Sequence, residues 1–530
     1  MTLSLTFHGA AGTVTGSCFR LHTPHGDVLV DCGLFQGTKT VRELNYRPFP
    51  FDPARIKAVL LTHAHIDHSG LLPKLVRLGF RGRIHATQGT VDLLEFMLPD
   101  SAYIQEVEVD HLNRRNRQRG RPAVEPIYTR NDAARTLTRM KAAAYDAWID
   151  VIPGVRARFW QAGHILGSAS VEVEVAARKG ATRLLFSGDI GPGGKLFHGD
   201  ADGPTQPDWL VVETTYGDRE RLDVDEETRR TLLGDEVRAA LGTGGNLLIP
   251  VFAVERTQEL LYDLNSLFDR RQIPPAEVFL DSPLASAVTG VFRKHLRDLG
   301  GGADPFARAN LHIVETVEQS KRLNAVAGGA IIMAASGMCD AGRIRHHLKN
   351  QLWRPDCTVL LVGYQAPGTL GHMLRQGVKR VRIHGEEVEV RARIRTLDVY
   401  SGHADRSSLL DWVGARGGAR QGVFLVHGEA EARAAIRDAL VARACDPESI
   451  VAPDLDETVD LNARHPLSVA EAPARLPASA VTAGSDWHNR YADAVLSLKQ
   501  ALDAAPDDAA RERLLKQVRS ALENREAVSR

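Results

Sequence analysis

The segment 60–70 places three histidines and one aspartate within six residues, directly after a short apolar run. Residues 57–62 have the composition of a buried β-strand, and the apolar spacing from Asp67 onward is that of a helix. The turn between them can direct side chains towards two neighbouring points. A lone histidine here would be an ordinary core or surface residue, and Asp67 alone an N-cap, but gathering so many titratable groups is costly unless they share a cation. The group predicts a metal site formed by His63, His65, Asp67 and His68.

Two later segments continue this pattern. His164 lies in 163–168 and Asp189 in 184–191, each at the point where a strand-like run meets a turn that contains glycine. Alone, His164 would be a loop histidine and Asp189 a turn former. In this order after the first segment, they resemble the metal-binding motifs of the metallo-β-lactamase fold superfamily.

Three motifs in the second half of the chain narrow the resemblance. Glu213 ends an apolar run, and His403 and His427 each lie in a short motif with glycine. These motifs resemble those of the β-CASP group, the nucleic-acid-cutting branch of the superfamily, and the resemblance extends over residues 3–463. Members similar to the cleavage and polyadenylation endonuclease carry histidine in the last motif, whereas DNA-processing members typically carry valine. His427 therefore implies RNA as the substrate.

The resemblance implies a site for two divalent cations. It assigns one ion to His63, His65 and His164, the other to Asp67, His68 and His427, and a bridging position to Asp189. Such nitrogen and carboxylate ligands suit zinc best, and manganese or iron would be tolerated. Two cations about 3.5–4 Å apart generate hydroxide near neutral pH and neutralise a phosphodiester oxygen during in-line attack.

The departing oxygen also needs a proton. Because imidazole has an unperturbed pKa near 6.5, His403 is expected to act as the general acid. Glu213 is expected to orient the His403 ring, although it could instead be a strand-end carboxylate paired with an arginine. Asp67 and Asp189 complete the expected catalytic set.

A long central segment splits the ligand set. Strand-rich sequence with metal motifs fills residues 1–207, strands and helices alternate over 208–395, and motif histidines resume within 396–463. If His427 joins the first ligands, the central block must be inserted and folded over the site. The resemblance implies an α/β fold, in which an αββα metallo-β-lactamase sandwich carries an inserted α/β β-CASP cap, with an RNA-binding cleft between them. Residues 464–530, which the resemblance does not cover, are predicted to form a helical tail, with helical spacing at 493–504 and 509–522. This tail could be a helical hairpin for dimer or partner contact, or equally a loosely attached appendage.

Two further segments are candidates for RNA contact. Residues 329–338 have the pattern of a buried strand that ends in a small-residue turn ahead of a helix. Such a turn can hold phosphate, here through Ser336, Gly337 and Arg343, although ordinary packing of strands and helices explains the pattern equally well. The basic tract 114–121 could line an RNA path, but a solvated helix face is the simpler interpretation.

Composition adds few constraints. The 66 lysines and arginines are equal in number to the 66 aspartates and glutamates, so binding to a polyanion must depend on local positive charge. The five cysteines lack CxxC spacing, which argues against zinc ribbons and a disulfide framework. No basic segment precedes the apolar N-terminal residues, and no run approaches the length of a membrane span. We expect a cytoplasmic enzyme with RNA as its partner, no membrane contact, and a homodimer formed through the tail or the cap.

The predicted function is that of a metal-dependent ribonuclease, which hydrolyses RNA phosphodiester bonds and leaves 5′-phosphate and 3′-hydroxyl ends. A small-molecule hydrolase of thioester or lactam type on the same fold would explain the first motif, but not the large insertion or the late histidines. A non-catalytic RNA-binding scaffold would be expected to have lost ligands, and none is missing.

Overall fold

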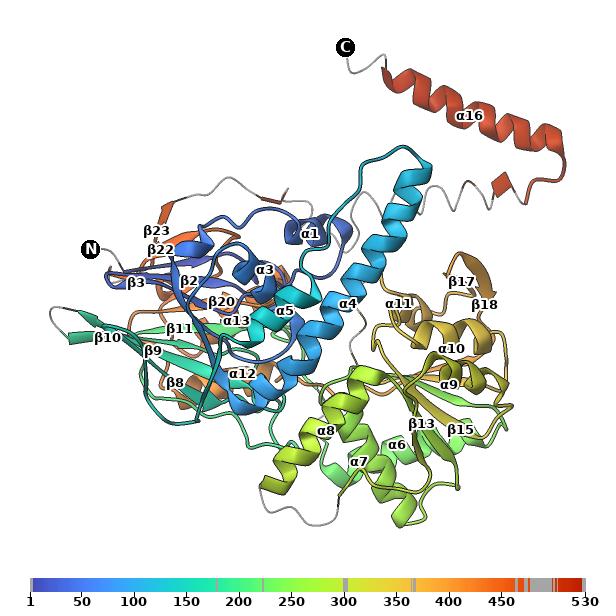
Figure 1. Ribbon diagram of the computed structural model, residues 1–530, viewed down its shortest axis with the longest axis horizontal. Helices are drawn as coiled ribbons and strands as arrows, with labels where there is room; N and C mark the ends of the chain where they lie inside the picture. Colours follow the sequence, from blue (N-terminus) through green and yellow to red (C-terminus); the bar gives the residue numbers. More distant parts are fainter. Residues whose placement is uncertain are drawn as a thin grey trace.

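In the computed structural model, two large β-sheets are stacked face to face, and a smaller parallel sheet with its helices lies beside them (Figure 1). The structure describes residues 3–177, 180–221, 224–298, 304–363, 365, 368–462, 466–470, 475–476, 498, 501–502 and 504–526. Within these ranges, none of the helices has an apolar stretch of the length that a bilayer requires.

The first sheet contains the strand that precedes the histidine-rich segment. In spatial order its strands are β23 (Leu467–Ala470), β22 (Thr458–Asp460), β1 (Ser4–Phe7), β2 (Phe19–Thr23), β3 (Gly26–Val30), β4 (Ile56–Leu60), β5 (Arg83–Thr87) and β6 (Met140–Ala143). β1 to β3 form an antiparallel meander, whereas β4, β5 and β6 run parallel to β3. Burial alternates along β2, as expected for a strand with one face against a core.

The second sheet mixes antiparallel and parallel strands. In spatial order these are β21 (Ile450–Val451), β20 (Gly422–Val426), β11 (Trp209–Glu213), β10 (Gly180–Phe186), β9 (Ala169–Ala177), β8 (Val155–Gln161) and β7 (Ile149–Ile152). β11 falls within the range 208–395 that the sequence assigns to the insertion, but it pairs in parallel with β10 and β20. The insertion therefore starts after β11. The boundary was misplaced because β11 is buried on both faces and resembles the strands of a doubly covered sheet.

Side chains from the facing surfaces of the two sheets form a central core. The Phe7 ring packs against Phe424 with their centroids 5.1 Å apart, and Trp209 stacks on Phe424 at 5.5 Å. Helices cover both outer faces: α3 (Leu72–Arg77), α4 (Gln88–Gln118) and α5 (Arg130–Leu137) on the first sheet, and α12 (Arg406–Ala415) and α13 (Ala430–Ala442) on the second. The predicted αββα sandwich is confirmed.

The inserted domain is a parallel sheet with helices on both faces. Its strands in spatial order are β14 (Leu311–Ile313), β13 (Glu277–Asp281), β15 (Ala330–Ala334), β12 (Leu247–Pro250), β16 (Thr358–Leu361) and β19 (Arg393–Thr396). Its helices are α6 (Glu226–Leu241), α7 (Arg256–Asp269), α8 (Pro283–Asp298), α9 (Val317–Arg322), α10 (Ile344–Gln351) and α11 (Leu370–Arg375). A hairpin of β17 (Arg380–Ile383) and β18 (Glu386–Glu389) follows α11. The predicted α/β insertion is confirmed.

After β22, the chain adds one more strand to the first sheet before it continues into the tail. β23 pairs with β22, and the Arg475 guanidinium binds the Asp456 carboxylate and donates to the carbonyl oxygen of His8. The helix expected at 509–522 is α16 (Asp508–Glu526), which lies apart from the sandwich and from the inserted domain (Figure 1). The helix expected at 493–504 falls mostly outside the described residues.

Three remaining helical features flank or extend the sandwich. The short helices α1 (Lys39–Arg42) and α2 (Ile66–Ser69) lie on either side of β4 in the chain. The C-terminal half of α4 projects away from the sheets (Figure 1), and the basic tract 114–121 is at its tip, where all five arginines are exposed. This is the geometry of a solvated helix face, the simpler of the two interpretations of the tract.

Candidate metal centre

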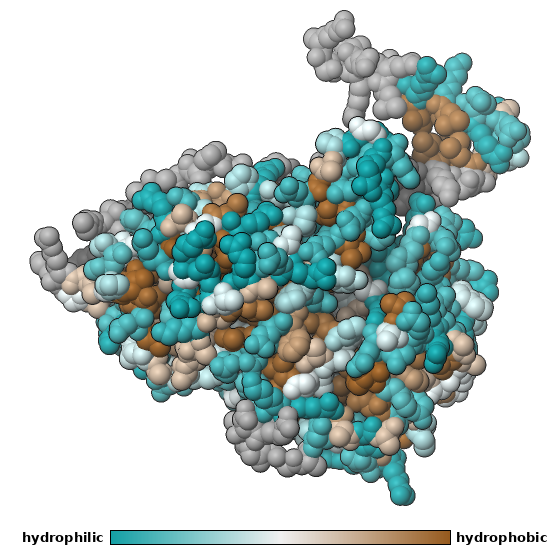
Figure 2. Space-filling model, viewed as in Figure 1, coloured by the Kyte–Doolittle hydropathy of each residue, from teal (hydrophilic) through white to brown (hydrophobic). Residues whose placement is uncertain are grey.

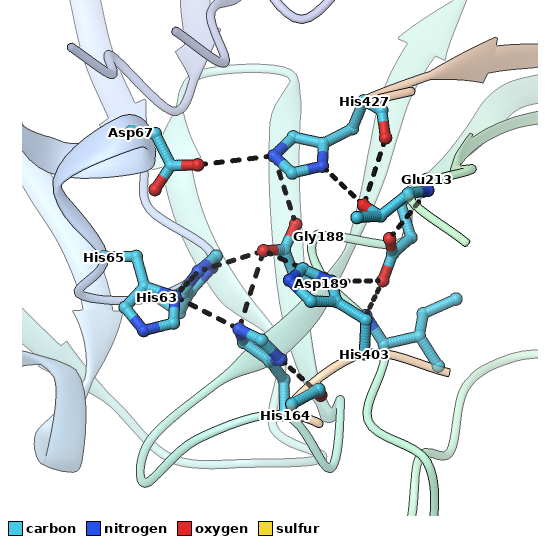
Figure 3. A network of polar contacts seen from close by, with 12 residues as sticks. His63, His65, Asp67, His164, Gly188, Asp189, Glu213, His403 and His427 are labelled. Carbon is cyan, nitrogen blue, oxygen red and sulfur yellow. Dashed lines mark hydrogen bonds and ion pairs between the residues drawn. The ribbon is translucent and has the colours of Figure 1, made fainter. Parts of the chain in front are cut away.

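The site lies where strands of both sheets end. β10, β11 and β20 run parallel and side by side, and Asp189, Glu213 and His427 stand at or just after their carboxyl ends. Because the carboxyl ends of parallel strands meet at one edge of a sheet, these three side chains lie close together. The segment 63–68 follows β4 in the first sheet and points towards the same place (Figure 3).

Three histidines and Asp189 form the first cluster. His65 Nδ1 lies 3.1 Å from both His63 Nε2 and His164 Nε2, and Asp189 Oδ2 lies 3.5 Å from each of these Nε2 atoms. A tetrahedral zinc ion with bonds of about 2.0–2.1 Å places its ligand atoms roughly 3.3 Å apart. The four atoms therefore have the spacing that one such ion requires.

The second cluster shares Asp189. His68 Nε2 lies 3.1 Å from His427 Nε2 and 3.2 Å from Asp189 Oδ1, and His427 Nε2 lies 3.6 Å from Asp67 Oδ2. Asp189 Oδ1 is buried and accepts no well-directed hydrogen bond within the described part of the chain. Burying such an oxygen is costly without a compensating partner, and a carboxylate that bridges two cations would have one on each side.

The other ring nitrogen of the histidines fixes their orientation. His164 Nδ1 lies 2.7 Å from the carbonyl oxygen of Gly402, which can only accept, so Nδ1 carries the proton and Nε2 presents its lone pair to the site. His68 Nδ1 lies 2.7 Å from Asp31 Oδ2 and donates in the same way. Contacts of this kind hold metal-binding histidines in one tautomer and one orientation.

Burial and charge set the protonation of the cluster. Burial lowers the pKa of His63 and His164 well below the ordinary value and lowers the pKa of His65 to about 4. These rings are therefore neutral near pH 7 and offer lone pairs rather than charge. Burial opposes ionisation of Asp189, but neighbouring rings, His427 foremost, hold the pKa of its carboxyl well below the usual range. The neutral nitrogens of the first cluster and the anionic Asp189 carboxylate form a donor set that suits zinc. His68 differs, because burial alone would lower its pKa but the charges of Asp189 and Asp31 raise it well above its ordinary value.

His403 and Glu213 lie together beside the first cluster. His403 Nδ1 lies 3.3 Å from Glu213 Oε1 and 3.9 Å from Asp189 Oδ2. Glu213 is fixed by its own contacts, because it accepts hydrogen bonds from the backbone nitrogens of Ile190 at 2.6 Å and Thr215 at 3.3 Å. Burial alone would lower the pKa of His403, but the Glu213 charge and hydrogen bond, with Asp189, raise it above its ordinary value. Among the described residues no arginine pairs with Glu213, so His403 is its cationic partner.

The turn after β15 contains two of the three expected phosphate-binding residues. Ser336 and Gly337 lie at the carboxyl edge of the inserted sheet. Arg343 differs from the prediction, because its guanidinium donates to Asp281 Oδ1 at 2.6 Å and to the backbone carbonyls of residues 314 and 315. These bonds occupy the guanidinium within the inserted domain, so Arg343 has a structural role and is removed from the candidates.

Sequence reasoning did not assign two residues that orient ligands. Asp31 contacts His68. It also accepts two hydrogen bonds from Thr62, one from the Thr62 backbone nitrogen at 2.8 Å and one from the Thr62 hydroxyl at 2.9 Å. Thr215 Oγ1 lies 2.9 Å from His427 Nδ1. The signal for Asp31 was a carboxylate directly after a buried strand, but only the pairing of β3 with β4 shows which histidine it contacts.

Acidic residues at the start of α7 contact two loops of the sandwich that carry cluster residues. Glu255 Oε2 accepts a hydrogen bond from the backbone nitrogen of Leu166 at 3.2 Å, and its Oε1 lies 3.2 Å from His198 Nε2. Lys195 Nζ donates to Glu259 Oε1 at 2.6 Å, and both side chains are buried. The inserted domain is therefore attached directly to the walls of the metal centre.

Three protein-family models match successive parts of the chain. The metallo-β-lactamase superfamily matches residues 11–226, the β-CASP domain matches residues 257–374, and the Zn-dependent metallo-hydrolase RNA specificity domain matches residues 387–451. The first and third matches lie mainly in the sandwich, and the second lies within the inserted domain. The order agrees with a sandwich interrupted by an insertion.

Curated relatives match over most of the chain. Ribonuclease TTHA0252 of Thermus thermophilus is 40% identical over 443 residues, which cover 82% of this chain and 95% of the relative. Transcription termination factor FttA of Methanothermobacter thermautotrophicus is 30% identical over 80% of this chain and 67% of its own length. An RNase J-like protein of Methanocaldococcus jannaschii is 27% identical over 77% of this chain and 89% of its own length. The chain therefore belongs to the β-CASP family of the metallo-β-lactamase superfamily.

Proposed function

We propose that this chain is a metal-dependent ribonuclease, which hydrolyses RNA phosphodiester bonds and leaves 5′-phosphate and 3′-hydroxyl ends. The observation that carries the proposal is the pair of clusters around Asp189 with the His403–Glu213 pair beside them. Support for RNA as the substrate comes from the RNA specificity domain and from the relative named as a ribonuclease. A small-molecule hydrolase would use the same clusters but would leave the inserted domain without a role.

In this proposal each cluster holds one divalent cation, with zinc best suited to the donors and manganese or iron tolerated. His63, His65 and His164 would hold one ion, Asp67, His68 and His427 would hold the other, and Asp189 would be a ligand common to both. The spacing of the ligand atoms, the neutral rings of the first cluster and the buried Asp189 Oδ1, which accepts no well-directed hydrogen bond within the described residues, support this assignment.

When bound, two such cations supply an ionised water near neutral pH and neutralise the scissile phosphate. Asp67 and Asp189 provide the negative charge that retains them. As the water oxygen bonds to phosphorus and the bond from phosphorus to O3′ breaks, His403 donates a proton to the departing O3′. Glu213 keeps the His403 ring oriented for this transfer, because backbone donors hold its carboxylate in place.

Of Ser336 and Gly337, Ser336 is proposed to bind a phosphate of the substrate, since Gly337 is buried. They follow β15 at the edge of the inserted sheet that meets the sandwich, and a small-residue turn lets a phosphate approach the backbone closely. Arg343 is not part of this proposal, since its Nη1 and Nη2 atoms donate to Asp281 and to two backbone carbonyls within the inserted domain.

The remaining proposals concern the whole chain. We place the sandwich in residues 1–213 and 396–476, the inserted domain between its two parts, and the tail in 477–530. We propose a homodimer formed through the tail, because α16 exposes the apolar residues Leu515 and Val518. Figure 2 shows hydrophobic surface over this helix. Light scattering on the full chain tests this, and a monomer would contradict it. The five free cysteines support a cytoplasmic location, where thiols stay reduced.

Metal removal and a choice of substrates test the proposed activity. The chain is stripped with a chelator, reloaded with zinc, analysed for bound metal, and assayed on 5′-labelled and 3′-labelled single-stranded RNA and on a thioester. We expect no RNA cleavage without metal, full cleavage at two zinc ions per chain, and products with 5′-phosphate ends. Hydrolysis of the thioester alone would replace the proposal with a small-molecule hydrolase, and zinc binding without any hydrolysis would replace it with a non-catalytic scaffold.

A further inference from the structure

An exposed aromatic side chain lies at the carboxyl edge of the inserted sheet. Phe252 is 37% exposed, whereas its apolar neighbours Val251 and Val254 are buried. Phe252 follows β12, whose last residue Pro250 pairs in parallel with Ala334 at the end of β15. Phe252 and the turn 336–337 therefore leave the sheet side by side at the same edge.

The Phe252 ring is seated on glycine backbone. A Cβ atom at Gly337 would lie 2.6 Å from two ring carbons, and one at Gly363 would lie 3.7 Å from the ring. Gln365, which is buried, donates through Nε2 to the carbonyl oxygens of Gly337 at 3.0 Å and Gly363 at 3.2 Å. The carbonyl oxygen of Phe252 accepts a hydrogen bond from Thr257 Oγ1 at 2.7 Å. The protein thus fixes the position of an aromatic ring that it does not bury.

The loop that carries Phe252 also touches the loops of the metal centre. Glu255 accepts a hydrogen bond from the backbone nitrogen of Leu166, two residues after a cluster histidine. The Arg256 guanidinium lies 5.9 Å from the ring centroid of Tyr400, three residues before the proposed general acid. A strand of RNA that reaches the centre along this edge passes Phe252.

We propose that Phe252 is a stacking surface for a nucleobase of single-stranded RNA whose phosphate lies at Ser336, since Gly337 is buried beneath the ring. This inference rests on the proposed ribonuclease function and adds to it a preference for unpaired RNA. Every base has a π-face, so stacking on a phenyl ring tolerates any sequence, whereas bases within a duplex are already stacked on one another. Phe252 is therefore expected to distinguish unpaired RNA from paired RNA, and not one base from another.

The experiment compares Phe252→Leu with a matched control. Trp353→Leu removes a more exposed aromatic, 54% accessible, which precedes β16 at the opposite edge of the same sheet. Phe252→Tyr keeps the π-face. Affinity for a labelled oligoribonucleotide is measured on the zinc-loaded full chain in a His403→Ala background, and KM and kcat are measured without that change. A series of oligonucleotides, each with one abasic position, locates the stacked base.

We expect Phe252→Leu to weaken binding and raise KM about 5- to 150-fold, since base stacking on an aromatic contributes about 1–3 kcal/mol. Phe252→Tyr and Trp353→Leu should stay within about twofold of the parent protein. One abasic position should weaken binding to the parent by a similar factor and have little further effect on Phe252→Leu. Equal affinities for Phe252→Leu and Trp353→Leu, a loss in kcat alone, or no sensitive abasic position would overturn the inference. A parent chain that fails to cut RNA would instead overturn the proposed function, and this inference with it.

Discussion

At the scale of single residues, hydrogen bonds made away from the site decide which atom each side chain presents to it. Spacing in the sequence is enough to nominate His164 and His68 as ligands, because both lie in compact motifs. Spacing does not reveal that the Gly402 carbonyl and the Asp31 carboxylate hold their Nδ1 atoms and leave Nε2 for a cation. These partners come from remote parts of the chain, so only the folded structure can identify them.

His403→Ala should stop RNA cleavage while the chain keeps both zinc ions. The ring contacts Glu213 and lies at the margin of the first cluster, so its loss removes the proton donor without removing a proposed ligand. General acids contribute about 10²- to 10⁴-fold to a rate, and kcat should fall by that factor. Metal analysis and steady-state kinetics measure the two properties separately.

The control for this variant is His111→Ala, which removes an exposed histidine on α4 and should leave both properties unchanged. Loss of a zinc ion from His403→Ala would show that His403 acts as a ligand, as the additional grouping of Asp189, Glu213 and His403 would allow.

At the scale of elements, α7 joins the inserted domain to the sandwich through acidic residues in and next to its first turn. The buried Lys195–Glu259 pair connects α7 to the loop that follows β10. The sequence pattern predicts the strand-turn-helix order of the inserted domain, since alternation of apolar runs and turns is a local signal. Contacts between α7 and loops of the other domain have no local signal, and for that reason no sequence-based expectation covered them.

Lys195→Met should lower the free energy of unfolding of the zinc-loaded chain by about 3 kcal/mol, because it leaves the Glu259 carboxylate buried without its closest cation. Urea unfolding followed by circular dichroism measures the change. Arg406→Ala breaks the exposed ion pair with Glu220 and should change stability by no more than about 1 kcal/mol. Equal stabilities of the two variants would mean that the buried pair does not hold the domains together.

At the scale of the whole molecule, the sequence predicts a sandwich with an inserted domain, but it does not predict the exact boundaries between them. If His68 and His427 belong to one site, the long segment between them must include an inserted domain. The structure has both the contact and the insertion. The position of β11 was missed because a strand buried on both faces has the same composition in either domain. The β23 strand within the expected helical tail was missed because four residues with one neighbour carry too little periodicity to distinguish a strand from a loop.

Acid should destabilise the folded chain, in part through His85 on β5. Burial lowers the pKa of His85 to about 4, whereas an unfolded chain binds that proton near pH 6.5. Between these values the unfolded state holds more protons, so the free energy of unfolding falls as the pH falls from about 6.5 to about 4. His85→Leu should therefore lose less stability than the wild type between pH 7 and pH 4.5 in urea unfolding. His111→Leu, at an exposed position, should follow the wild type, and a parallel response of all three proteins would contradict the assignment to His85.

The separation of 359 residues between His68 and His427 also determines when the second cluster can form during synthesis on the ribosome. Translation at about 5–20 residues per second leaves an interval of roughly 20–70 s in which the early histidines have emerged and their late partner has not. β11 likewise waits for β20, its parallel neighbour. A nascent chain therefore has an incomplete second cluster until His427 has emerged, so before that point the messenger and the ribosomal RNA around it are not exposed to a complete nuclease site.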